Sequence, residues 1–384
     1  MKLKKYFSIF LINTFIFLFL ISIVEIISRK LEAKNTEEQK LLDLKRSIAY
    51  EGIKDQFDLL SDDCNRNYFM VSNGEEIEFA DKNFDCPGVT VRNGKRVTVG
   101  SNSRLSKKVH IFGGSTVFGT GSTDAFTIPS LIQKKLNQKG LDNVSVINHG
   151  FASLVSKQQL SKLKKTNINE NDVVVFYDGG NDAFLSYIYE NMDGTIVGFN
   201  RENKISFLFS RIRFYLSKES SFYRLLSKIK KGKSNEYAYC GPEFNESKSN
   251  KYIKNYFKNL TQANRYTDSK NIRFIHFFQP ILGSGGQLEV NNYYPKVLLS
   301  AGNFEENPNF DKCLIENINQ YYRIKANAYD NFKNSFSKNN LTQIFNGKNI
   351  PESHFYIDNI HITPKGSEII AEEMTKQILT KIKF

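Results

Sequence analysis

The stretch over residues 109–121 constrains the fold most. It reads Val-His-Ile-Phe-Gly-Gly-Ser-Thr-Val-Phe-Gly-Thr-Gly, an apolar run that ends abruptly in two glycines and a serine. This order predicts a strand, a tight turn that carries a hydroxyl, and the start of a helix. In open α/β sheets, chemistry takes place outside the carboxyl ends of the strands. The turn is therefore a phosphate-binding loop, a turn that presents a nucleophilic hydroxyl, or an ordinary connection between a strand and a helix.

Apolar runs and amphipathic segments alternate from residue 107 onward. Strands are predicted at 107–112, 144–148, 172–177 and 271–279, and helices at 128–138, 154–165 and 363–381. Residues 173–176 read Val-Val-Val-Phe, a run typical of a strand buried on both faces. The sequence predicts an α/β domain with a parallel sheet covered by helices on both faces.

The chain divides into three predicted regions. Residues 1–27 form a cytoplasmic tip and a transmembrane anchor, 28–104 a stalk and a small β-rich lead-in, and 105–384 the α/β domain, with insertions at about 183–270 and 283–350. Within the lead-in, Asn73-Gly74 and Asn93-Gly94 stand between short strand-like runs. Asn-Gly in this setting indicates a β-hairpin.

The predicted anchor is almost entirely apolar from Tyr6 to Ile27, with Asn13 and Glu25 as the strongly polar interruptions. About 20 apolar residues suffice for a helix to cross a bilayer. Lysines precede the span, but basic residues also follow it, so the charge rule alone leaves the orientation open. We expect a single-pass membrane protein whose large domain is extracytoplasmic, in the periplasm or at the cell surface.

The cysteines favour the same compartment. Cys64, Cys86, Cys240 and Cys313 are scattered, without the paired spacing of a zinc site. Proximity along the chain favours disulfides Cys64–Cys86 and Cys240–Cys313 in an oxidising compartment, and four buried free thiols are the alternative.

The net charge is +13. An anionic partner such as nucleic acid, an acidic glycan or lipid headgroups would explain it, but lysine and asparagine are abundant throughout. No zinc-finger, RNP-type or basic-heptad pattern is present, so we expect no nucleic-acid partner. Residues 207–231 form basic amphipathic segments, which are expected to cover the core with their aromatic faces; binding to a membrane or an acidic glycan is the alternative.

A phosphate loop does not fit the turn. Gly114 and Gly119 have the Walker spacing, but Thr120-Gly121 stands where Lys-Ser/Thr is required. A dinucleotide fingerprint also fails, because its second glycine falls at Ser115.

A nucleophile turn needs a base for the hydroxyl proton and donors for the developing oxyanion. His361 is the candidate base, and Asp358, three residues before it, is placed to orient its imidazole. The histidines at 110, 149, 276 and 354 lie in strands or strand-end turns, or lack such an aspartate. Gly150 and Asn181 follow the next two predicted strands and supply candidate oxyanion donors.

Four blocks in this order resemble the SGNH (GDSL-type) hydrolases: 113–119, 148–150, 179–182 and 358–361. The resemblance covers about residues 105–384. It implies a three-layer α/β/α, flavodoxin-like domain. It also implies that Ser115 is the nucleophile, His361 the base and Asp358 its orienter, with no metal or organic cofactor. The oxyanion donors would be the Ser115 and Gly150 backbone N–H groups and the Asn181 side-chain amide.

Two positions depart from the family pattern. Gly114 stands where many members have aspartate, and Phe151-Ala152-Ser153 lacks a further glycine that is often found there. These departures affect the shape of the substrate and acyl pocket.

The sequence therefore predicts a serine esterase that removes acyl groups, such as acetyl, from a carbohydrate or lipid. An O-acyltransferase that modifies surface polysaccharide with the same residues is the first alternative. A non-catalytic anchored protein that binds glycans or assists assembly is the second, and the complete set of catalytic residue types argues against it.

Overall fold

The computed structural model describes a defined subset of the 384 residues. The described residues are 13–16, 19, 20, 22–30, 59, 70–73, 76–79, 82–102, 104, 105, 107–184, 199, 200, 212, 216, 220–223, 245–285, 308–348, 355–357 and 360–382. Predictions that concern Asp358, Cys64 and Cys240 lie outside the described residues.

A five-stranded sheet in the order β11-β10-β8-β6-β7 forms the centre of the fold. Its strands are β6 (Lys107–Gly113), β7 (Val144–Asn148), β8 (Val173–Asp178), β10 (Arg273–Phe278) and β11 (Ser337–Asn340). All four neighbouring pairs are parallel. The first four strands agree with the predicted ones to within two residues, and the expectation of a parallel α/β sheet is confirmed.

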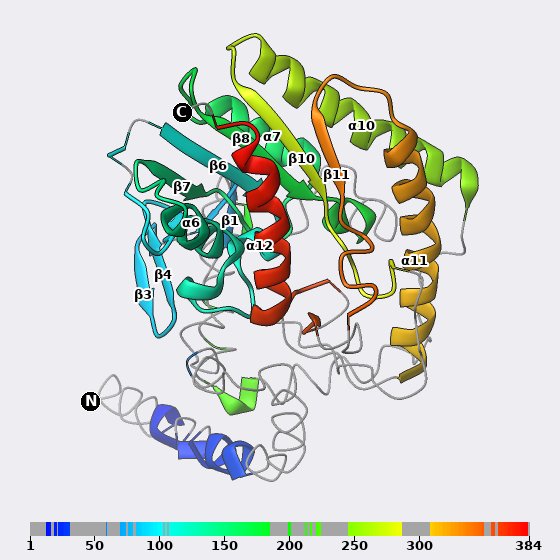
Figure 1. Cartoon of the computed structure of the whole chain (residues 1–384). Coiled ribbons are helices and arrows are strands. Elements are labelled where there is room, and N and C mark those ends of the chain that lie inside the picture. The colour runs from blue at the N-terminus through cyan, green and yellow to red at the C-terminus, as the bar shows by residue number, and fades with distance from the viewer. Residues whose placement is uncertain are drawn as a thin grey trace. The chain divides into compact units, whose positions relative to one another are not determined.

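Helices cover both faces of this sheet (Figure 1). Helices α6 (Ile128–Gln138) and α12 (Pro364–Leu379) pack on one face, and α7 (Ser156–Lys165), α10 (Glu246–Asp268) and α11 (Pro308–Asn331) on the other. Neighbouring residues of one strand serve opposite layers: Val175 packs with the first group and Phe176 with the second. Every residue of β8 is buried, which explains its continuous apolar sequence.

The two stretches expected as insertions contain elements of this core. Helix α10 lies within 183–270, and α11 and β11 lie within 283–350. Tyr256 and Tyr329 from these helices are fully buried against the sheet.

The strand order creates a switch point between β6 and β8. From β6 the chain proceeds to β7 on one side and then crosses back to β8 on the other. The turns that follow β6 and β8 therefore diverge above the sheet and leave room for a site at its carboxyl edge. This topology matches the flavodoxin-like order that the family resemblance implies.

Contacts between residues divide the chain into two compact units, one of 1–44 with 203–237 and one of 45–202 with 238–384. The β-rich lead-in belongs to the second unit, together with the sheet. Most of the basic segment 207–231, which was expected to cover the core, lies outside the described residues, and its range belongs to the first unit. Among the described residues, no helix combines the length and apolarity required to cross a membrane, and the predicted span over 6–27 is only partly described.

The lead-in consists of short antiparallel strands. Strands β3 (Phe84–Cys86), β4 (Val89–Arg92) and β5 (Lys95–Arg96) form one sheet, and β1 (Met70–Asn73), β2 (Glu76–Phe79) and β9 (Phe199–Asn200) form another, in which β9 pairs parallel to β1. Asn93 and Gly94 have φ angles of 51° and 71°, as the predicted Asn-Gly hairpin requires. Cys86 is disulfide-bonded, while the pairing of the four cysteines stays a prediction.

Arg96 joins the lead-in to the turn that carries Ser115. Its side chain is 1% exposed and forms an ion pair of 2.9 Å with Asp124. Its guanidinium also donates to the carbonyl oxygens of Phe118, Gly119 and Ser122 at 3.1, 2.7 and 2.5 Å. One buried charge from the hairpin thus binds carbonyls that follow the predicted nucleophile.

Replacing Arg96 with methionine should therefore destabilise the protein. The change removes the cation that pairs with the Asp124 carboxylate and the side-chain donor to several buried carbonyls, and removal of one partner from such a buried pair costs about 3 kcal/mol or more. Arg92→Met is the matched control, because the pair of Arg92 with Asp85 on the same hairpin is exposed. Urea denaturation should show a large loss for Arg96→Met and little change for Arg92→Met. Equal effects would contradict this role for Arg96.

Candidate active site

The predicted nucleophile lies at the start of a short helix, α5 (Ser115–Phe118), directly after β6. The helix begins because the carbonyl of Gly114 accepts from the N–H groups of Val117 and Phe118 at 3.1 and 3.0 Å. Ser115 is 8% exposed, so its hydroxyl lies in a site with little solvent.

The side chains of Ser115 and His361 meet, although they are 246 positions apart. The distance from Ser115 Oγ to His361 Nε2 is 2.7 Å. With the imidazole proton on Nδ1, Nε2 accepts the serine O–H, which is the arrangement needed to take that proton during attack. The structure thus brings together the two residues that the sequence predicts as nucleophile and base.

The backbone around His361 is held on both sides. The carbonyl of His361 accepts from the N–H of Ile357 at 2.8 Å, and the N–H of Thr363 donates to Phe355 at 2.9 Å. The Thr363 side chain then caps α12 by accepting from the N–H of Gly366. Asp358 lies between these anchored residues but outside the described part of the chain, so its role stays a prediction.

Asn181 follows β8 and lies beside the turn of Ser115. Its Nδ2 donates to the carbonyl of Leu154 at 3.0 Å. A Cβ atom placed on Gly114 would lie 2.2 Å from the same Nδ2, so a side chain at position 114 would displace the carboxamide. This contact gives a physical reason for glycine where many family members have aspartate.

Gly150 lets the end of β7 approach α5. A Cβ atom at this position would lie 2.2 Å from the backbone nitrogen of Phe118, which leaves no room for a side chain. The N–H of Gly150 donates to Asn148 Oδ1 at 2.8 Å. An oxyanion that uses the Gly150 N–H, as the family resemblance implies, has to displace the Asn148 carboxamide oxygen. The role of the Gly150 N–H as an oxyanion donor therefore stays a prediction, and it requires that the hydrogen bond to Asn148 be broken.

The backbone conformation of Ser153 is a feature that the sequence did not predict. Its φ of 59° lies in the left-handed region, which non-glycine residues rarely adopt. It belongs to the stretch that lacks the further glycine of the family, and it directly precedes Leu154, whose carbonyl holds Asn181. The departure from the family pattern was the available signal for this strained position.

The other described histidines have structural partners. His110 Nδ1 lies 2.9 Å from His149 Nε2, and its Nε2 lies 3.2 Å from a carboxylate oxygen of Asp172. Burial lowers the pKa of His149 well below its ordinary value, and its ring stacks on Phe112. His276 is fully buried between Asp178 and a tyrosine hydroxyl.

Comparison with known proteins identified no matching family model and no significant match among curated proteins. Among solved structures, the fold is similar to an acetyl xylan esterase (16% identity, 71% of this chain and 99% of that one, TM-score 0.38). It is also similar to a lipase/acylhydrolase from Enterococcus faecalis (14%, 72% and 97%, TM-score 0.37). A member of the lipolytic G-D-S-L family from Veillonella parvula has 11% identity, coverage of 71% and 97%, and a TM-score of 0.36. All three TM-scores are below 0.5, so the functional assignment below rests on the site residues.

The contact between position 114 and Asn181 predicts a non-additive pair of substitutions. Asn181→Ala should lower kcat for an ester substrate by about 10²–10³-fold if its amide stabilises the oxyanion. Gly114→Ala should also lower kcat, because its methyl group displaces that amide. In the double variant the amide is already absent, so the rate should be no lower than that of Asn181→Ala alone. Rates that fall multiplicatively would contradict this coupling, and steady-state kinetics of the three variants measure it.

Proposed function

We propose that this chain is a serine hydrolase of the SGNH type that removes acyl groups, such as acetyl, from a carbohydrate or lipid through an acyl-enzyme at Ser115. The observation that carries the proposal is the 2.7 Å contact between Ser115 Oγ and His361 Nε2 at the carboxyl edge of the sheet. The position of Asn181 beside the Ser115 turn supports it further.

The proposed reaction has two halves. Ser115 Oγ attacks the ester carbonyl while His361 Nε2 takes its proton, and the carbonyl oxygen becomes an oxyanion. The second N–H of the Asn181 amide and the Ser115 backbone N–H stabilise this charge, with Gly150 as a further predicted donor. The protonated imidazole, oriented by Asp358, gives its proton to the leaving alcohol. Water then attacks the acyl-enzyme with His361 as base and releases the acid.

Ser115→Ala should lower the hydrolysis of a short-chain aryl ester at least about 10³-fold, because the variant lacks the proposed nucleophile. Ser269→Ala, an exposed serine after α10, is the control and should retain the full rate. Circular dichroism checks that both variants fold. An active Ser115→Ala enzyme would refute the proposal.

Transfer to a sugar hydroxyl would use the same acyl-enzyme. Incubation with acetylated oligosaccharides, with and without an unacetylated acceptor, separates the two reactions by product mass. Free acetate as the main product supports the hydrolase. Quantitative movement of acetyl groups to the acceptor would instead assign an O-acyltransferase.

We also propose that residues 1–44 and 203–237 form a membrane-attached unit that carries the catalytic unit outside the cytoplasm. The apolar stretch from Tyr6 to Ile27 supports this proposal. Seven large apolar side chains in it are between 37% and 72% exposed, namely Phe15, Ile16, Phe19, Leu20, Ile23, Ile26 and Ile27. At roughly 100° per residue they lie on one side of the helix, and Glu25 lies on the other.

Glu25 links this helix to the second segment of the unit. Its carboxylate accepts from the hydroxyl of Ser220 at 2.9 Å and from the N–H groups of Ser221 and Phe222 at 2.9 and 3.0 Å. The apolar side chains of Ile212 and Leu216, one helical turn apart, are also exposed. Basic residues are frequent over 207–231, which suits anionic lipid headgroups.

The chain contains no tryptophan, so one substitution creates a single reporter. In the full chain reconstituted into vesicles with anionic lipid, Leu216→Trp should be quenched by brominated acyl chains. Val99→Trp is the control, since Val99 has a similar exposure of 45% in the other unit, and it should not be quenched. Equal fluorescence of Leu216→Trp with and without bromolipid would contradict membrane contact by the second segment.

A further inference from the structure

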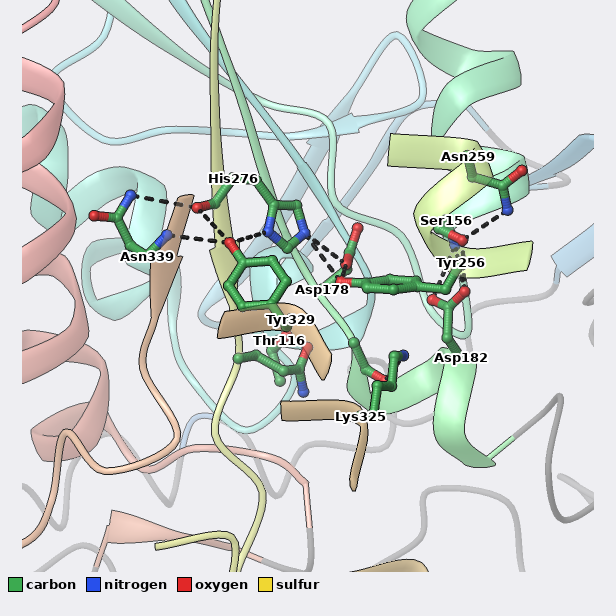
Figure 2. A network of polar contacts seen from close by, with 12 residues as sticks. Thr116, Ser156, Asp178, Asp182, Tyr256, Asn259, His276, Lys325, Tyr329 and Asn339 are labelled. Atoms are coloured by element: carbon green, nitrogen blue, oxygen red, sulfur yellow. Dashed lines mark hydrogen bonds and ion pairs between the residues drawn. The ribbon is translucent and has the colours of Figure 1, made fainter. Parts of the chain in front are cut away.

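Helix α11 contains a fully buried lysine, Lys325, which Figure 2 shows in the same polar network as Asp178 and Asp182. Lys325 Nζ donates to the carbonyl of Gly179 at 3.0 Å and lies 3.6 Å from the centre of the Tyr256 ring. The same carbonyl accepts from the N–H of Ala183 at 3.1 Å. Two donors on one carbonyl thus hold the turn of residues 179–183, which presents Asn181.

Two buried carboxylates flank this turn. Asp178 Oδ1 accepts from the Tyr256 hydroxyl at 2.6 Å and lies 3.1 Å from His276 Nε2. Asp182 accepts from the Ser156 hydroxyl at 2.6 Å and from its backbone N–H at 3.0 Å. Asn181 donates to Leu154, just before α7, and Asp182 binds Ser156, the first residue of α7. The turn is therefore attached to the start of α7 at two points. The positive charge of Lys325 interacts favourably with both carboxylates.

The charges of Lys325 and Asp182 do not stabilise the folded protein at neutral pH. Burial lowers the pKa of Lys325 to about 8, although Asp182 and Asp178 oppose the shift. Burial also raises the pKa of Asp182 to about 6, against the effect of Lys325. Both shifts mean that the folded protein disfavours the charged forms, so their ionisation reduces stability near pH 7. Charges retained beside a candidate site at the expense of stability point to a functional role.

We propose that Lys325 is a positioning residue, which holds the turn of residues 179–183 so that the Asn181 amide stays beside Ser115. The inference rests on the proposed esterase function, in which that amide stabilises the oxyanion. Lys325 acts from helix α11 through the Gly179 carbonyl and does not itself contact the reacting atoms.

The arrangement predicts a dependence of kcat on pH. Among the described residues, Asp182 in the turn and Asp178 on β8 act electrostatically on Lys325, and the Tyr256 ring on α10 lies beside it. His276 on β10, with Tyr322 and Tyr329 on α11, interacts with these aspartates or with one another. Burial raises the pKa values of these three tyrosines above their ordinary range, so they remain neutral at moderately alkaline pH. Above about pH 8 the neutral amine of Lys325 still donates to the Gly179 carbonyl, but this bond is weaker than the charge-assisted one, so the turn should loosen and kcat should fall.

Unfolding does not explain this alkaline limb, the predicted fall of kcat above about pH 8. Between about pH 8 and the ordinary lysine value of 10.5, the unfolded chain binds more protons at this position than the folded one. The contribution of Lys325 to stability therefore rises with pH over this window. A fall in kcat without a fall in melting temperature distinguishes positioning from a structural role.

The test uses the full chain in detergent micelles and measures kcat and KM for a short-chain aryl ester from pH 6 to pH 10. The wild type should lose activity with a midpoint near pH 8. Lys325→Met should lower kcat by about 10- to 100-fold with little change in KM, and its remaining activity should lack that limb. Arg323→Met removes a charge from the exposed side of the same helix and should behave as the wild type. Lys325→Gln, which is neutral but keeps an N–H donor, should also lack the limb and lose less kcat.

Three outcomes would overturn the inference: a wild type without an alkaline limb, a Lys325→Gln variant that retains it, or a Lys325→Met variant with the kcat of the wild type. The wild-type profile and Lys325→Gln keep the test decisive if Lys325→Met does not fold. Ser115→Ala separates this inference from the proposed function. If Ser115→Ala is inactive and the Lys325 variants are normal, only the positioning role fails, whereas an active Ser115→Ala refutes the esterase itself.

Discussion

The parallel pairing of β6 with β8 is the constraint on which the site depends. Their register places Gly113 opposite Tyr177, so the two strands end side by side. The turn after one strand carries Ser115 and the turn after the other carries Asn181. Because the chain leaves these strands in opposite directions, nothing from a direct connection fills the space between them. His361 contacts Ser115 from the segment that precedes α12, 246 positions later in the chain.

Buried charges from distant elements support both turns. Arg96 from the lead-in binds carbonyls after α5, and Lys325 from α11 binds the first carbonyl after β8. Neither side chain touches Ser115 in the contacts described above, yet each binds backbone within five residues of a predicted site residue. The lead-in is thus part of the same packed unit as the sheet, with Cys86, Val89 and Val91 packed against Phe118. Short turns with little packing of their own depend on such long-range contacts for their position.

The sequence was sufficient for the elements whose signal is local. Strand β8 was predictable because four successive residues are apolar and β-branched or aromatic, and the turn at Ser115 because small residues end a strand abruptly. Strand β11 was not predictable, since Ser-Lys-Asn-Asn has no strand signal and forms a strand through its ladder with β10 at the sheet edge. The role of Lys325 was also not predictable, because its partner Gly179 is 146 positions away and a lysine in a polar helix normally faces solvent. The engagement of the Gly150 N–H by Asn148 also depends on turn geometry that no motif specifies.

The central claim is that Ser115 is a nucleophile activated by His361, and covalent labelling tests it most directly. A fluorophosphonate reacts with an activated serine hydroxyl and leaves a stable phosphonyl adduct of known mass. Incubation of the full chain, followed by mass spectrometry of the intact protein and its peptides, should show one adduct, located on Ser115. The His361→Ala variant should remain unlabelled under the same conditions. An adduct on a different serine, or equal labelling of Ser115 without His361, would contradict the account.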